Sequence, residues 1–183
     1  MINKLLTNLG LTILRLISSL PISFLNALGG GLGLLGYYLL KKRRNVGLLN
    51  LSLCFPEMGE AEKNHLIKEH FKELIRSGLC YGLIFYASPD KLRKVVEIRG
   101  LENYNKVRGQ IPVVLLAPHF LALDIGANRL TLETPGYSVY AEQRNAYLTE
   151  RIKQARLRFI KDQGGEIFSR REGLRLIVRK MKQ

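Results

Sequence analysis

The sequence has few of the residues that staple small domains or bind metals. Two of its 183 residues are cysteines, Cys54 and Cys80, and three are histidines. Two cysteines cannot build a disulfide scaffold and suit a reducing compartment. The scattered histidines offer no paired ligand spacing for a zinc finger or ribbon. The composition therefore excludes these two fold classes, and we expect no metal site.

Acidic residues are absent from the first 44 positions, which carry a charge of +6. Residues 45–138 are nearly balanced at +1, whereas residues 139–183 carry +7, and the whole chain carries +14. Two basic ends around a near-neutral middle favour an anionic surface or ligand. On charge alone, nucleic acid and phosphorylated lipid both stay open.

Charged residues are also absent from the 25 positions of 16–40, and four cations follow at 41–44. A cleaved signal peptide would have its positive region first and no cationic block after the apolar run. We predict that residues 1–44 are a membrane anchor, with the bulk of the chain on the cytoplasmic side. The anchor is either a spanning helix or an interfacial helix pair bent at Pro21.

Glycines within this run match two motifs. Gly31, Gly33 and Gly36 have the spacing of a dinucleotide-binding loop, but they lie within an apolar run that ends at a basic block and lack the strand and amphipathic helix that such a loop joins. Gly29 and Gly33 form a small-residue pair of the kind that lets helices approach closely. We therefore favour helix packing over nucleotide binding.

Residues 45–183 are expected to form an α/β domain. The hydrophobic spacing predicts helices from residue 60 and over 90–97, and His65 and His70 are then solvated helix residues. After Gly100, strands are predicted at 111–117, 137–141 and 166–169, alternating with helices at 121–132, 146–161 and 171–182. This alternation indicates a mainly parallel sheet, in which ligands bind beyond the carboxyl ends of the strands.

One histidine in this region has the surroundings of a catalytic base. His119 lies just beyond the expected strand 111–117, and Asp124 follows five positions later at a helix start. A carboxylate on one ring nitrogen would fix the tautomer, and the other nitrogen could deprotonate a hydroxyl. The alternative is a capping histidine and an ordinary helix-start aspartate.

The residues around His119 resemble a motif of a known family. His119 and Asp124 match the H-x4-D/E motif of the lysophospholipid-acyltransferase superfamily. The whole chain is similar to the bacterial lipid A biosynthesis acyltransferases in the segments 43–46, 50–51, 54–57, 115–119 and 140–158. The resemblance implies an N-terminal membrane-anchoring helical segment followed by a partial α/β/α sandwich over 45–183. Relatives continue beyond Gln183, so we expect the domain to be incomplete at its C-terminus.

The resemblance also implies an activity. A fatty acyl chain would pass from acyl carrier protein to a hydroxyl of a phosphorylated lipid A precursor, at the cytoplasmic face of the inner membrane. His119 would be the general base and Asp124 its orienting partner, although many relatives have the longer glutamate there. The hydroxyl attacks an activated thioester directly, so no covalent enzyme intermediate and no cofactor besides acyl-ACP is expected.

Several arginines are candidates for binding the thioester oxygen of the acyl donor or the phosphates of the acceptor. The family carries a downstream basic residue, and Arg156 matches it best, followed by Arg158. Arg144 and Arg170 come after the second and third expected strands and are further candidates for oxyanion or phosphate binding. The alternative for Arg156 and Arg158 is a solvated basic helix face.

Other functions stay open. The acceptor could be a lysophospholipid or another glycolipid. Alternatively, the chain could have no catalytic activity and act as a basic module that binds a membrane surface or nucleic acid. Nucleic acid is disfavoured because the only aromatic residues within 144–182 are Tyr147, Phe159 and Phe168, too few for a stacking surface.

Overall fold

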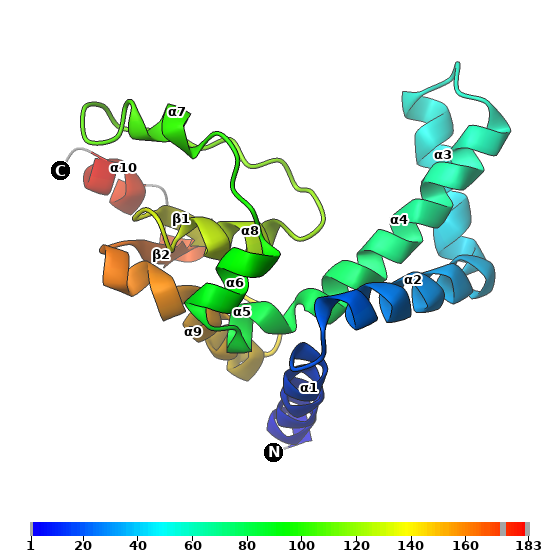
Figure 1. The fold of residues 1–183 in the computed structure, drawn as a ribbon, viewed down its shortest axis with the longest axis horizontal. Coiled ribbons are helices and arrows are strands. Elements are labelled where there is room, and N and C mark those ends of the chain that lie inside the picture. The colour runs from blue at the N-terminus through cyan, green and yellow to red at the C-terminus, as the bar shows by residue number, and fades with distance from the viewer. Residues whose placement is uncertain (1, 173–174, 182–183) are drawn as a thin grey trace. The chain divides into compact units, whose positions relative to one another are not determined.

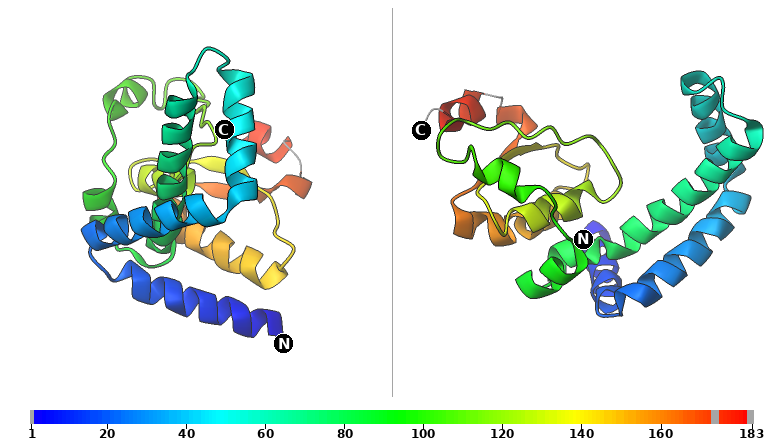
Figure 2. Two further views of the ribbon diagram at one scale, coloured as in Figure 1. Left: turned by 90° about the vertical axis from the view of Figure 1, so that its right-hand side faces the viewer. Right: turned by 45° about the horizontal axis from the view of Figure 1, so that its top comes forward.

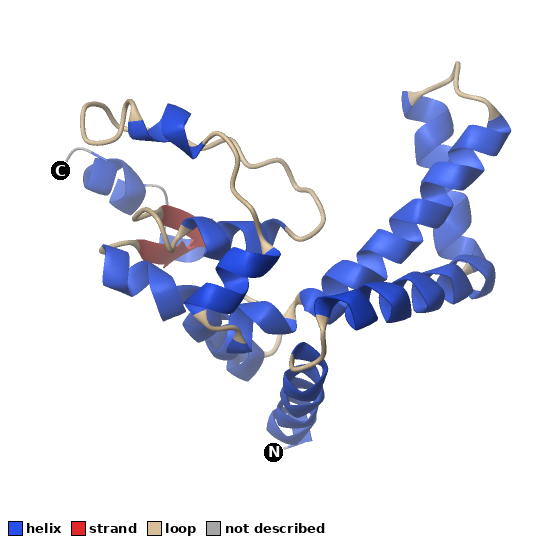
Figure 3. Cartoon of the chain, viewed as in Figure 1, coloured by secondary structure: helices blue, strands red, loops and turns tan. Residues whose placement is uncertain are grey.

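The structure, a computed structural model, describes residues 2–172 and 175–181 and is mostly helical. Figure 1 shows the order of the elements and Figure 3 their types. The chain divides into two compact units: Leu16–Tyr81, and Met1–Arg15 together with Gly82–Gln183.

The unit Leu16–Tyr81 is an assembly of helices. It contains α2 (Ile22–Leu39), α3 (Lys41–Cys54) and α4 (Glu60–Cys80), and it is preceded by α1 (Ile2–Ser18). Tyr37, Ile67 and Phe71 form its buried core, with Leu48 and Leu51 packed against them. Residues 45–81, which the sequence places in the acyltransferase domain, thus fold together with α2.

Pro21 divides the N-terminal apolar run into two helices. Proline disfavours helical geometry in the residue before it but is tolerated where a helix begins. Accordingly, α1 ends at Ser18, and α2 begins directly after Pro21. In the described residues, α2 is the one helix whose length and composition would allow it to cross a membrane.

The second unit carries the candidate site. It contains the first part of α1 and ten further elements: α5 (Gly82–Tyr86), α6 (Pro89–Val95), α7 (Leu101–Asn105), α8 (Leu123–Leu130), β1 (Tyr137–Tyr140), α9 (Ala146–Ile160), η1 (Lys161–Gln163), β2 (Glu166–Ser169), η2 (Arg170–Glu172) and α10 (Arg175–Met181). Polar contacts attach α1 to it: Asn145 donates to Thr7, Tyr147 donates to Asn8, and Tyr86 donates to the carbonyl of Leu11.

The predicted strands at 137–141 and 166–169 are confirmed. They are β1 and β2, which pair in parallel with Tyr137 opposite Glu166, and α9 forms the crossover between them. Leu157 and Ile160 of α9 pack on Ile167 of β2. The predicted helices from residue 60 and at 90–97, 121–132 and 146–161 correspond to α4, α6, α8 and α9. The predicted helix 171–182 corresponds to α10 over the described residues.

The predicted strand at 111–117 is wrong. Residues 112–120 have no regular secondary structure, and their apolar side chains are exposed, Leu116 to 92% and Val114 to 79%. A strand exists only where a neighbouring backbone accepts and donates its hydrogen bonds. In the described residues, the sheet consists of β1 and β2 paired with each other. The composition of segment 111–117 thus suits a buried strand, but in the described residues no neighbouring strand pairs with it.

Candidate active site

Two residues that the sequence singled out separately meet in the structure. Arg156 of α9 places Nη2 2.7 Å from Oδ1 and 2.8 Å from Oδ2 of Asp124, in the first turn of α8. Both side chains are partly shielded, with 27% and 33% of their surface exposed. A guanidinium in contact with both carboxylate oxygens fixes their orientation. The pair joins two helices across 32 positions of sequence.

The start of α8 fixes where Asp124 stands. Ala122, directly before the helix, has a left-handed backbone with φ of 61°. This conformation is costly for a residue with a Cβ and turns the chain sharply between His119 and Asp124. Asn128, one turn further along, donates to the carbonyl of Asp124 at 2.9 Å. The carboxylate also lies at the helix N-terminus, where the helix dipole favours negative charge.

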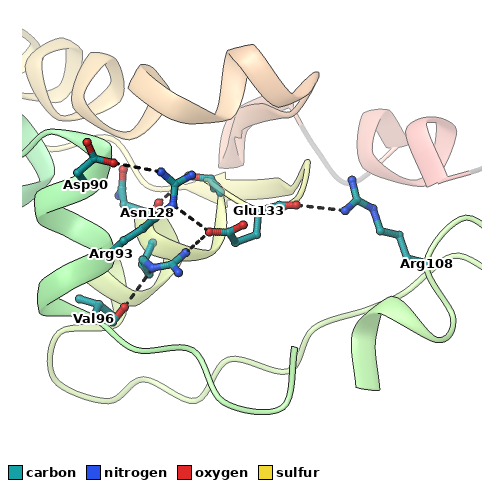
Figure 4. Close-up of polar contacts among 8 residues, drawn as sticks. Asp90, Arg93, Val96, Arg108, Asn128 and Glu133 are labelled. Atoms are coloured by element: carbon teal, nitrogen blue, oxygen red, sulfur yellow. Dashed lines mark hydrogen bonds and ion pairs between the residues drawn. The ribbon is translucent and has the colours of Figure 1, made fainter. Parts of the chain in front are cut away.

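A charged cluster holds the other end of α8 (Figure 4). The Glu133 carboxylate accepts from Arg129 at 2.7 Å and from Arg93 of α6 at 3.3 Å. Arg108 donates to the backbone carbonyl of Glu133, and Arg129 donates to that of Val96. Burial by itself raises the pKa of Glu133, but hydrogen bonds and charge from Arg129 and Arg93 outweigh it, so the pKa lies below its usual range. The cluster therefore anchors the helix that carries Asp124.

His119 lies in the exposed loop 112–120. Within the described part of the chain, no hydrogen bond joins its imidazole to Asp124, whose carboxylate is engaged by Arg156. The His119–Asp124 dyad therefore stays a prediction. The loop between Pro112 and Ala122 is the segment that would have to bring the two side chains together.

Arg158 is bound to backbone carbonyls of its own unit. Its guanidinium donates to the carbonyl of Ile84 at 3.1 Å and to that of Ala87 at 2.8 Å, at the end of α5. It also stacks over the ring of Phe159, 4.9 Å from the centroid. Burial lowers the pKa of this guanidinium. These contacts cap α5, because a helix end leaves carbonyls without intrahelical donors.

Arg144 and Arg170 are exposed and follow the carboxyl ends of β1 and β2. The structure adds a residue there that sequence reasoning missed. Glu142 accepts from the Ser169 hydroxyl at 3.0 Å and pairs with Arg171 at 3.0 Å. The position of Glu142 just after an expected strand was the available signal. The carboxyl edge of the sheet thus carries both signs of charge.

In the part of the chain that the structure describes, no group of three or more histidine, cysteine, aspartate or glutamate side chains is placed to hold a metal ion. The site consists of one carboxylate bound by a guanidinium, a histidine in the loop before it, and arginines at the sheet edge. Such groups suit proton transfer and the binding of anionic oxygens.

Similarity to known proteins shows the class to which this chain belongs, a family of acyltransferases. The chain belongs to the bacterial lipid A biosynthesis acyltransferases, whose family pattern it matches over residues 1–183. It is 33% identical to the lipid A biosynthesis lauroyltransferase of Escherichia coli K12 over 76% of this chain and 46% of that protein. It is also 29% identical to the palmitoleoyltransferase of lipid A biosynthesis from the same organism, over 97% of this chain and 57% of that protein.

A lipid A biosynthesis acyltransferase of Haemophilus influenzae is 33% identical over 84% of this chain and 50% of its own length. The chain thus spans about half the length of the curated relatives it matches. No solved structure matches the chain.

Proposed function

We propose that the protein transfers a fatty acyl chain from acyl carrier protein to a hydroxyl of a phosphorylated lipid A precursor. Family membership supports the reaction class, and the names of the relatives, which act in lipid A biosynthesis, support the acceptor class. The observation that carries the assignment of the site is the Asp124–Arg156 pair, because it joins two predicted site residues.

His119 is proposed as the general base. Its imidazole removes the proton of the acceptor hydroxyl, and the oxygen attacks the thioester carbonyl. The C–S bond then breaks, and the carrier sulfur leaves as a thiol after taking the proton back from the imidazolium. Asp124 stabilises the imidazolium once loop 112–120 brings His119 to it, and Arg156 holds the carboxylate in place. The transfer is direct, so the mechanism uses no cofactor besides acyl-ACP.

The arginines are proposed to bind the negatively charged groups of the substrates and of the transition state. Arg144 and Arg170, exposed at the carboxyl edge of the sheet, are suited to the phosphates of the acceptor. Arg156 is suited to the developing oxyanion, since it lies beside Asp124. Arg158 is the weakest candidate, because its donors already serve backbone carbonyls. The reaction is proposed to take place at the cytoplasmic face of the inner membrane, with an anionic membrane surface and acyl carrier protein as partners and no nucleic acid.

Acyl transfer by the His119→Ala variant tests the proposal. Purified full chain in mixed micelles would receive acyl-ACP and a phosphorylated lipid A precursor, and mass spectrometry would measure the acylated product. We expect the rate to fall by about 10²- to 10⁴-fold, the usual contribution of a general base. His65→Ala, which changes an exposed histidine of α4, is the matched control and should leave the rate unchanged. Equal rates in the His119→Ala variant and the parent would exclude His119 as the base.

A further inference from the structure

The two faces of α2 differ in what covers them. The outward face presents a continuous apolar surface, which we call the leucine face: Phe24, Leu28, Leu32, Leu35 and Leu39, between 37% and 68% exposed. It has no charged residue along the 18 residues of the helix. Leu25, Gly29, Gly30, Gly33 and Tyr37 on the other face are buried. An exposed apolar strip of this length indicates a partner that is itself apolar.

The buried face of α2 lies directly on the backbone of α4. A Cβ added to Gly33 would lie 2.4 Å from Cα of Lys72, and one added to Gly29 would lie 2.9 Å from Cα of Arg76. The Nε of Arg76 also donates to the carbonyl of Asn26 at 3.1 Å. Only glycine permits an approach this close, so α4 is fixed against the middle of α2. Figure 2 shows the two helices running side by side.

The middle of α4 is strongly charged. Lys72 pairs with Glu69 at 2.6 Å, and Arg76 pairs with Glu73. If α2 crossed the bilayer, its central glycines would bring these four charged side chains to the depth of the hydrocarbon core. Charged groups at the bilayer centre are costly and are rare in spanning segments. The packing of α4 therefore conflicts with a spanning α2.

We propose that α2 lies along the membrane surface and does not cross it. The leucine face enters the acyl-chain boundary, and α4 covers the opposite side and faces water. Exposed Lys41, Lys42 and Arg43, at the end of α2, supply positive charge for anionic headgroups. The proposal rests on the membrane location in the proposed function but is independent of the catalytic step.

Depth measurement with single tryptophans tests this orientation, because the chain contains no tryptophan. Phe24→Trp, Leu32→Trp and Leu39→Trp place the probe at the start, middle and end of the leucine face. The outer two positions are roughly 22 Å apart along the helix. Each full-length variant would be bound to vesicles of phosphatidylcholine and phosphatidylglycerol whose acyl chains carry bromine either near the headgroup or near the bilayer centre.

We expect all three tryptophans to be quenched to the same extent. Each should be quenched at least about twofold more strongly by the shallow bromines than by the deep ones. His65→Trp, on the far side of α4, should be quenched by neither lipid. Strong quenching of Leu32→Trp by the deep bromines, with shallow quenching at Phe24 and Leu39, would show a span and overturn the proposal. Absence of quenching at all three positions would overturn it as well and would point to a second copy or another protein on the leucine face. Because no acyl donor is present, these outcomes are independent of the acyl-transfer assay.

Discussion

At the scale of single residues, the main finding is that Asp124 is held by an arginine. The sequence associated Asp124 with His119, five positions away, whereas the structure places it on Arg156, 32 positions away. Nothing in the local sequence around Asp124 indicates this partner. The pairing depends on how α8 packs against α9, and the start of α8 depends on the left-handed turn at Ala122.

A double-mutant cycle measures this pair. Asp124→Asn, Arg156→Gln and the double variant would be compared by urea unfolding monitored by circular dichroism. We expect a coupling free energy of roughly 1 kcal/mol, because the side chains are only partly shielded from water. The exposed pair Asp90–Arg93, 3.6 Å apart, is the control and should show almost no coupling. Additive effects of the two substitutions at Asp124 and Arg156 would contradict the contact.

Glu133 gives the stability a dependence on pH. Its pKa is lowered in the folded state, mainly because the hydrogen bonds from Arg129 and Arg93 overcome the effect of burial. A carboxyl with a lowered folded pKa stabilises the fold above its unfolded pKa, about 4.3. This contribution disappears as the pH falls through the folded pKa.

The Glu133→Gln variant should therefore be less stable than the parent by about 1 kcal/mol at pH 7, since both partners are charged and the site is partly exposed. The difference should shrink as the pH falls below the unfolded pKa and through the lowered folded pKa, because the parent carboxyl then becomes protonated. Thermal unfolding at pH 7 and at pH 3 measures it. Glu97→Gln, in an exposed pair with Arg99, is the control for the same substitution at an exposed site. A difference that is constant with pH would show that the ionised carboxylate does not stabilise the fold.

At the scale of elements, periodicity predicted helices well and the strand 111–117 badly. The helices from residue 60 and at 146–161 were recognisable because one face of each is apolar, which is a local property. The strands at 137–141 and 166–169 form because their backbones pair with each other in parallel. Segment 111–117 is more apolar than either, but in the described residues no strand pairs with it, and its side chains are exposed.

The contact between α2 and α4 predicts opposite effects for two glycines on one helix. In Gly33→Ala, the new methyl would overlap the backbone of Lys72 and Phe71, which cannot move aside without separating the helices. We expect a loss of about 1–3 kcal/mol in the free energy of unfolding. Gly31→Ala places the same methyl in open space and should gain up to about 1 kcal/mol, because alanine favours helix. Urea unfolding in micelles compares them, and equal effects would contradict the close packing.

At the scale of the whole molecule, the charge of +14 should govern attachment to membranes. Lysines and arginines near an anionic surface each contribute about 1 kcal/mol at low salt, and salt screens this attraction. We expect binding to phosphatidylglycerol-containing vesicles to weaken by about tenfold or more between 0.05 M and 0.5 M salt. Vesicle flotation measures this, with pure phosphatidylcholine vesicles as the control that lacks the salt dependence. Equal binding to both kinds of vesicle would contradict an electrostatic contribution.

The sequence alone determined the properties that are local or additive. These are the basic ends, the apolar run divided at Pro21, the amphipathic helices, the two strands that flank α9, and the family, which is shown by residues spread along the chain. From the same signals came the candidates His119, Asp124, Arg144, Arg156, Arg158 and Arg170.

Only the tertiary structure decided which of these side chains meet. It paired Asp124 with Arg156, placed Arg158 on the carbonyls of Ile84 and Ala87, and left segment 112–120 exposed. It also set the glycines of α2 against the charged middle of α4, which turned an apolar run that could span a membrane into one proposed to lie on it. The physical reason is that hydrogen bonds and close packing depend on neighbours distant in sequence, and a one-dimensional pattern does not specify them.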